Sequence, residues 1–182
     1  MHFTLADLVT DITQNGIEAD SSLVELEVTD GDGEFRFLTR DNGKGMTEEE
    51  LKRAIDPFVT DGIKHPHRKV GLGIPFLIQT AEQSNGGWDI KSEKGKGTVV
   101  TAWFDTGNVD TPPIGDIPGM FRTILMFDSK AEIIIRRKRK NDGAEEEYEI
   151  KKSELAEALG GLEDAGSLVL LGEYLRSLET EE

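Results

Sequence analysis

Asp41-Asn-Gly-Lys-Gly45-Met46 is the most informative segment of the chain for its fold. It follows Glu34–Thr39, where apolar and polar residues alternate as they do in a β-strand. It precedes Thr47, which opens an acidic segment that predicts a helix to about Ile55. The glycines allow a tight backbone turn. An ordinary Asp-Asn-Gly turn is the alternative for this stretch taken alone.

Three further motifs surround this stretch in a fixed order within the first hundred residues: Asp11-Ile-Thr-Gln-Asn15, Val70-Gly-Leu-Gly73 and Gly95-Lys-Gly-Thr98. The first lies in a predicted helix over residues 4–19, so its two polar ends face the same side, one turn apart. The second leads into a predicted helix, whose first N–H groups can meet phosphate oxygens. Short glycine motifs recur by chance, but the four together indicate an ATP site without a P-loop.

The remaining elements are predicted from periodicity and turn residues. Expected strands, besides residues 34–39, cover residues 23–28, 88–92, 98–104, 122–127, 132–140 and 145–150, and a helix covers residues 73–84. Asn141-Asp-Gly143 predicts a hairpin, and Ser153 and Ser167 are expected to cap two helices. The second of these helices carries a leucine face: Leu168, Leu171, Leu175 and Leu178.

Residues 3–105 resemble the catalytic domain of bacterial sensor histidine kinases. More broadly they resemble the GHKL superfamily, which includes gyrase, heat-shock chaperones of the ninety-kilodalton class, mismatch-repair ATPases and anti-sigma serine kinases. The resemblance implies a two-layer α/β sandwich, the Bergerat fold. Residues 1–106 are then expected to form the ATP-binding domain. Residues 107–182 would be a C-terminal extension of a β-hairpin and helices, packed on the same sheet.

The resemblance assigns roles to the two polar residues of the first helix. Asn15 matches the asparagine that ligates Mg²⁺, and an amide oxygen suits a hard cation. Asp11 matches the position where hydrolysing members carry a glutamate as general base. Aspartate is one methylene shorter, which limits its reach to an attacking water. The alternative is a pair of solvated polar residues on an amphipathic helix.

The resemblance also assigns the adenine site. Asp41 matches the aspartate that accepts a hydrogen bond from the adenine amino group, which an ionised carboxylate can do. Gly43 and Gly45 would let the backbone turn beside the base, and Met46 would pack on its face. Thr98 matches the threonine that supports the base through its hydroxyl or a water molecule, although a plain strand threonine is the alternative.

The phosphate site is expected at Gly71, Leu72 and Gly73. Residues 57–70 lack periodicity and are predicted to be a mobile loop that closes as a lid, with Lys64 neutralising phosphate charge. An exposed basic loop is the alternative. A metal site at the two histidines of this loop is not expected, because no third ligand is evident.

Composition narrows the class of protein. The chain has 182 residues, is 36% hydrophobic and contains no cysteine, so a packed core is expected and a disulfide framework is excluded. Its formal net charge of −15 disfavours binding to nucleic acid or to an anionic membrane. The basic run Arg136–Lys140 is expected to pair with Glu145–Glu147 across the hairpin rather than with nucleic acid. We expect a cytoplasmic protein.

The function follows from the resemblance in three versions. The predicted asparagine helix begins near Met1, which leaves no room for a phosphoacceptor hairpin, so a self-phosphorylating sensor kinase is not expected. A slow ATPase or ATP-dependent regulator that acts on a protein partner is the first version. A serine/threonine protein kinase of the anti-sigma type is the second, and a non-catalytic ATP-sensing interaction module is the third. Formation of a homodimer stays open.

Overall fold

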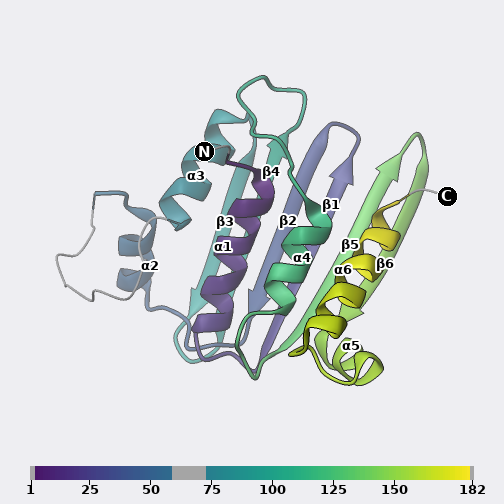
Figure 1. Cartoon of the computed structure of the whole chain (residues 1–182). Coiled ribbons are helices and arrows are strands. Elements are labelled where there is room, and N and C mark those ends of the chain that lie inside the picture. Colours follow the sequence, from purple (N-terminus) through teal and green to yellow (C-terminus); the bar gives the residue numbers. More distant parts are fainter. Residues whose placement is uncertain (1–2, 59–72, 181–182) are drawn as a thin grey trace.

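The computed structural model describes residues 3–58 and 73–180 (Figure 1). Within these residues six strands form one sheet, in the order β3-β4-β2-β1-β5-β6. The strands are β1 (Leu23–Gly31), β2 (Glu34–Asp41), β3 (Gly87–Glu93), β4 (Gly97–Asp105), β5 (Glu132–Asn141) and β6 (Ala144–Lys151). The helices are α1 (Leu5–Glu18), α2 (Glu48–Ile55), α3 (Gly73–Gln83), α4 (Ile117–Leu125), α5 (Lys152–Leu159) and α6 (Ala165–Glu179).

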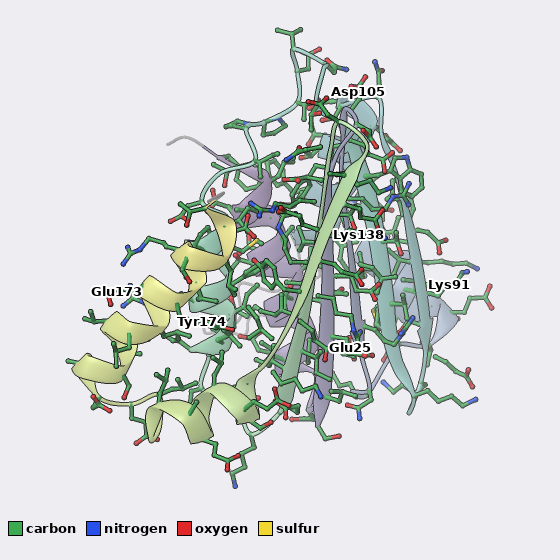
Figure 2. All side chains as sticks on the ribbon, turned by 90° about the vertical axis from the view of Figure 1, so that its right-hand side faces the viewer. Glu25, Lys91, Asp105, Lys138, Glu173 and Tyr174 are labelled. Carbon is green, nitrogen blue, oxygen red and sulfur yellow. The ribbon has the colours of Figure 1, made fainter. Side chains whose placement is uncertain are left out.

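The helices α1, α3, α4 and α6 lie side by side on one face of the sheet (Figure 1). The opposite face, which we call the open face, carries solvent-facing side chains such as Glu25, Lys91 and Lys138 (Figure 2). This arrangement confirms the predicted two-layer α/β sandwich.

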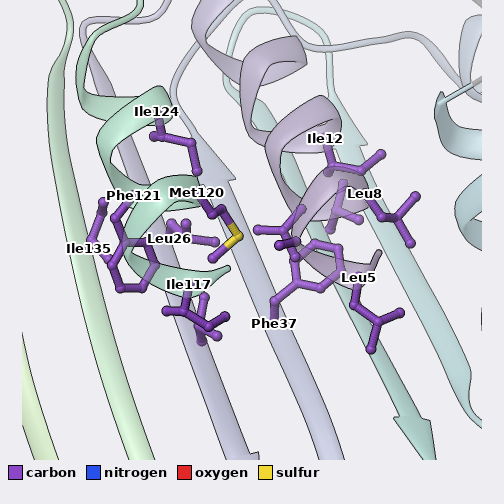
Figure 3. Close-up of a cluster of buried hydrophobic side chains, with 14 of the residues drawn as sticks. Leu5, Leu8, Ile12, Leu26, Phe37, Ile117, Met120, Phe121, Ile124 and Ile135 are labelled. Carbon is purple, nitrogen blue, oxygen red and sulfur yellow. The ribbon is translucent and has the colours of Figure 1, made fainter. Parts of the chain in front are cut away.

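Alternation along the strands produces this division into two faces. In β1, Val24, Leu26 and Val28 are fully buried, whereas the residues between them are only partly covered. The buried row meets apolar side chains of α1 and α4 (Figure 3). The labelled members of this core are Leu5, Leu8, Ile12, Leu26, Phe37, Ile117, Met120, Phe121, Ile124 and Ile135. Burying each large apolar side chain stabilises the fold by about 1.5–3 kcal/mol.

The C-terminal residues extend the same sheet. Strand β5 pairs in parallel with β1 along its whole length, from Leu23 opposite Glu132 to Gly31 opposite Lys140. The segment between β4 and α4, residues 106–116, packs against the start of α1, where the Leu5 N–H donates to the Pro113 carbonyl at 2.9 Å. A domain boundary at residue 106 stays a prediction.

The strand predicted over residues 122–127 is wrong, because this segment belongs to α4 and its C-cap. Asp116 caps the helix by accepting a hydrogen bond from the Gly119 N–H at 3.0 Å, and Pro118 lies in the first turn. The buried residues follow helical spacing over the full helix: Ile117, Met120, Phe121, Ile124 and Leu125. The strand prediction considered only residues from Arg122 onward, so it did not include the helical spacing that begins at Ile117 or the cap at Asp116.

The two predicted serine caps are also wrong. Helix α5 begins after Lys151 without a side-chain cap, and Ser153 lies inside it. Helix α6 is capped by Asp164, whose carboxylate accepts from the Ser167 N–H at 2.9 Å. The Asn141-Asp-Gly143 hairpin is confirmed, with φ of 47° at Asp142 and 84° at Gly143.

The leucine face of α6 packs against the protein as its spacing indicates. Leu171 and Leu175 are buried, and Leu178 packs against the core. The predicted pairing of the basic run with Glu145–Glu147 is confirmed for Lys138, which contacts Glu145, and for Arg139, which contacts Glu146. Arg136 pairs instead with Glu149, outside the predicted acidic run.

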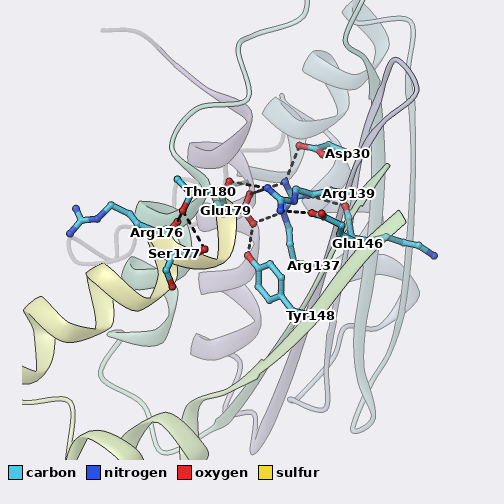
Figure 4. Close-up of polar contacts among 10 residues, drawn as sticks. Asp30, Arg137, Arg139, Glu146, Tyr148, Arg176, Ser177, Glu179 and Thr180 are labelled. Atoms are coloured by element: carbon cyan, nitrogen blue, oxygen red, sulfur yellow. Dashed lines mark hydrogen bonds and ion pairs between the residues drawn. The ribbon is translucent and has the colours of Figure 1, made fainter. Parts of the chain in front are cut away.

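A buried ion-pair cluster fastens the end of α6 to the sheet (Figure 4). Arg137 is 2% exposed and donates to Glu179 and to Asp30, each at 3.0 Å. Tyr148 also donates to Glu179. Burial alone would lower the pKa of Arg137, but the hydrogen bonds to Glu179 and Asp30 raise it. Burial and the neighbouring Glu179 raise the pKa of Tyr148.

We predict that Arg137→Ala destabilises the protein by about 3–5 kcal/mol, because it removes a buried arginine and leaves two mostly covered carboxylates, Asp30 and Glu179, with only the longer 3.9 Å contact of Arg139 to Glu179 as an ion pair. Arg136→Ala is the matched control, since Arg136 points to the open face and its side chain is 39% exposed. Its loss should cost about 1 kcal/mol or less. Urea unfolding of both variants measures the difference. Equal losses in the free energy of unfolding for the two variants would show that the ion-pair cluster does not hold α6 in place.

Candidate nucleotide site

The exposed side of α1 carries the first two candidate residues. Asp11 and Asn15 are both solvent-exposed and lie at the edge of the stripe in which Leu8 and Ile12 are buried in the core. Helix α3 begins beside them. A Cβ placed on Gly73 would lie 3.6 Å from Nδ2 of Asn15. The positive end of the α3 dipole therefore opens next to the predicted Mg²⁺ ligand.

Asp41 reaches the same helix from the sheet. It stands at the end of β2, opposite Val24, and its side chain faces Gly16 of α1. A Cβ on Gly16 would lie 3.2 Å from Oδ2 of Asp41. This glycine was missed by the sequence reasoning, although a glycine directly after Asn15 inside a helix is a signal of close approach.

The carboxylate of Asp41 is held by backbone donors. The Gly43 N–H donates to Oδ1 at 2.9 Å. Burial raises the pKa of Asp41 above its ordinary value, while hydrogen bonds from the backbone of Gly43 and Thr98 partly oppose the shift. The half-buried carboxylate keeps Oδ2 toward α1, so it is suited to accept a hydrogen bond from a ligand that enters there.

The glycine loop after Asp41 packs against the turn between β3 and β4. Gly45 has a φ of 62°, and a Cβ there would lie 2.0 Å from the carbonyl oxygen of Glu93. The Gly95 N–H donates to the Lys44 carbonyl at 2.7 Å. Only glycine fits this conformation at this distance, so the loop has a fixed path.

Thr98 is connected to the glycine loop through a serine. Its hydroxyl lies 2.8 Å from Oγ of Ser92, and that oxygen accepts a hydrogen bond from the Met46 N–H, also at 2.8 Å. The sequence reasoning missed Ser92, because its partners come from other segments. Thr98 therefore helps to hold the loop that carries Met46.

Asn42 also anchors the loop. Its Oδ1 accepts hydrogen bonds from the N–H groups of Ser22 and Leu23, at 2.9 and 3.0 Å. The sequence indicates only that Asn42 lies in a turn, and nothing in the local sequence indicates that its side chain contacts the start of β1.

The phosphate side of the site is only partly described. Lys64, Gly71 and Leu72 lie outside the described residues, as does most of the predicted lid over residues 57–70. The structure thus brings together Asp11, Asn15, Asp41, Gly43, Gly45, Met46, Gly73 and Thr98 as parts of three segments around α1. Their contacts with a nucleotide stay predictions.

A hollow of about 390 Å³ lies close by but on the other side of the sheet. Its lining includes Asp41 and Thr98, together with Arg40, Lys91 and Val99 of the open face. Because the Asp41 side chain faces α1, this hollow is separate from the candidate site.

Comparison with known proteins agrees with this geometry. The family described as "Histidine kinase-, DNA gyrase B-, and HSP90-like ATPase" matches residues 3–108. Sporulation kinase C of Bacillus subtilis (strain 168) is 30% identical over 97 residues, and sporulation kinase E of the same organism is 34% identical over 99 residues. Each match covers 52% of this chain, but 22% and 13% of the respective kinase.

A mismatch-repair protein is similar over a shorter stretch. DNA mismatch repair protein MutL of Kosmotoga olearia (strain ATCC BAA-1733 / DSM 21960 / TBF 19.5.1) is 39% identical over 57 residues, which is 31% of this chain and 9% of that protein. The family match spans more than half of the chain and includes every motif around α1. The chain therefore belongs to the histidine kinase-, DNA gyrase B- and HSP90-like ATPase family and carries its ATP-binding, histidine kinase-like domain.

Proposed function

We propose that the chain binds Mg²⁺-ATP against the exposed side of α1 and acts as a slow ATPase or ATP-dependent regulator of a partner protein. The observation that carries this proposal is the convergence on one helix. Gly73 adjoins Asn15 and Asp41 adjoins Gly16, so the start of α3 and the end of β2 meet at neighbouring residues of α1.

Each end of the nucleotide has matching chemistry at this convergence. Oδ2 of Asp41 would accept from the adenine amino group, and the start of α3 would face the phosphates. Within the described residues no group of three or more histidine, aspartate or glutamate side chains could hold a metal. Asn15 would therefore hold Mg²⁺ together with phosphate oxygens, where the ion would neutralise phosphate charge.

Asp11 is the candidate base. It lies one helical turn before Asn15 on the same exposed side, so a carboxylate oxygen can accept the proton of a water molecule that attacks the terminal phosphate. Its short side chain makes slow hydrolysis the expected result. Because this side of α1 is exposed, a hydroxyl of another protein could take the place of water, which supports a serine/threonine kinase as the second candidate.

The cellular location of the protein is also proposed here. In residues 3–58 and 73–180 no helix has both the length and the apolar character needed to cross a membrane. The chain matches less than a quarter of either sporulation kinase, so the activity of those whole proteins does not transfer to it. We propose a cytoplasmic location.

We predict that Asp41→Ala weakens ATP binding by on the order of 1.5–3 kcal/mol, because a charge-assisted hydrogen bond to adenine is lost. Wild-type protein should prefer ATP to GTP, and the variant should lose this preference. Calorimetry with Mg²⁺-ATP measures both. Asp89→Ala is the matched control, since Asp89 is an exposed aspartate on β3 whose ion pair is with Lys91. If the ATP affinity of Asp41→Ala were unchanged, Asp41 would not be the residue that binds the adenine ring.

The same residue gives a stability test without nucleotide. The pKa of Asp41 is raised in the folded state, so its ionised form opposes folding at a pH above that folded pKa. Asp41→Asn should therefore stabilise the nucleotide-free protein at neutral pH, and this gain should decline once the pH falls below the folded pKa and vanish below the unfolded pKa of about 3.8. Thermal unfolding across pH measures the difference. If Asp41→Asn were less stable than the wild type at neutral pH, the ionised Asp41 carboxylate would not be destabilising the folded protein.

We predict that Asp11→Asn lowers the rate of hydrolysis by about 100-fold or more while binding stays largely intact, because a general base typically contributes that much. Asp11→Glu should raise the rate, since it restores the missing methylene. Glu18→Gln on the same helix is the control, as Glu18 is exposed and interacts with Gln14. Phosphate release measures hydrolysis, and equal rates in all variants would exclude Asp11 as the base.

A further inference from the structure

Helices α4 and α6 lie side by side and run in opposite directions on the helical side of the sheet (Figure 1). Their outer surface lies away from the nucleotide site on α1 and α3. Figure 2 shows Glu173 on the side of α6 that faces away from the sheet. This surface is the part of the C-terminal region that the fold leaves uncovered.

Two arginines from the two helices meet at one glycine of α6. A Cβ on Gly172 would lie 3.7 Å from Nη2 of Arg176 and 3.9 Å from Cδ of Arg122. Both side chains are exposed, and Arg176 points away from the ion-pair cluster at the end of its helix (Figure 4). The junction between α4 and α6 therefore presents two guanidinium groups to solvent.

These two arginines lack counter-ions within the described residues. Arg36, Arg40, Arg136, Arg137 and Arg139 all form ion pairs there. A chain with 36 acidic and 21 basic residues offers carboxylates in excess. Arg53 on α2 also forms no ion pair among the described residues, but Arg122 and Arg176 are brought together at one junction. Guanidinium groups are suited to bind carboxylates in a bidentate manner.

One exposed apolar side chain from each helix lies on the same flank as the arginines. Val169, one turn before Gly172 on α6, is 56% exposed, and Met126, one turn after Arg122 at the end of α4, is 40% exposed. A shallow hollow of about 480 Å³ lies along the outer side of α4, lined in part by Arg122 and Met126. Apolar side chains gathered in this way beside charged groups are typical of surfaces that bind other proteins.

We propose that this surface, the α4–α6 patch (Arg122, Met126, Val169, Gly172 and Arg176), binds a segment of a partner protein in which carboxylates lie next to apolar side chains. The proposal rests on the proposed function in one respect, namely that the chain acts on a partner. A second copy of this chain is disfavoured, because each copy carries a net charge of −15 and would bring the same arginines to the contact.

A defined peptide tests the proposal on the whole chain. The probe is a 16-residue helical peptide with leucines along one face and glutamates beside them. Two control peptides carry lysine in place of glutamate, or serine in place of leucine. Backbone NMR spectra recorded during titration should show shifts concentrated on α4 and α6 with the probe and not with either control. Absence of binding, or shifts confined to other elements, would overturn the proposal.

Charge variants make the test specific. Arg122→Gln and Arg176→Gln should each weaken peptide binding roughly twofold to fivefold, as expected for exposed ion pairs. Arg53→Gln on α2 is the matched control and should bind as the wild type does. Glu173→Gln should strengthen binding, since it removes the one carboxylate among the outward residues 169–177 of α6. Equal affinity in all four variants would refute the role of the arginines.

Two further measurements separate this inference from its alternatives. ATP affinity is measured in every variant; it should not change, so that loss of peptide binding cannot be attributed to a failed nucleotide site. Sedimentation equilibrium of the protein alone should show no self-association through this surface. A dimer that is lost in Arg122→Gln and Arg176→Gln would overturn the assignment to a partner protein and identify a second copy as the occupant.

Discussion

The position of α1 on the sheet is the constraint on which the rest of the structure depends. Burial of Leu8 and Ile12 fixes the rotation of this helix, and the same rotation places Asp11 and Asn15 at the solvent-exposed edge of the buried stripe. Gly16 then allows the helix to approach the end of β2, where Asp41 stands. The core residues and the candidate site residues therefore adjoin on one helix, and a shift of α1 would disturb both.

The surroundings of Asp41 show how one feature can lower the free energy of unfolding and strengthen ligand binding at the proposed site. Burial raises the pKa of its carboxyl, so ionisation in the nucleotide-free protein is unfavourable. The backbone of Gly43 and Thr98 offsets part of this cost. An acceptor held partly out of water gains more from a ligand donor than an exposed one does, which is the advantage that a binding site draws from the arrangement.

Local signals in the sequence predicted most elements, but contacts between distant segments escaped them. The alternation in β1 and the turn at Asn141-Asp-Gly143 act over a few residues, and the structure confirms both. The segment 122–127 was misread because its helical period begins at Ile117. Parallel pairing of β5 with β1, and the link from Ser92 to Met46, join residues far apart in the chain, which no local pattern specifies.

The most direct test of the central claim is to map a non-hydrolysable Mg²⁺-ATP analogue by backbone NMR on the full chain. The account predicts the largest shifts at Gly16 of α1, at Gly43 and Gly45 of the loop after β2, and at the start of α3. Lys91, on the open face, should change little. Shifts concentrated around the hollow on the open face, with α1 unaffected, would contradict the account.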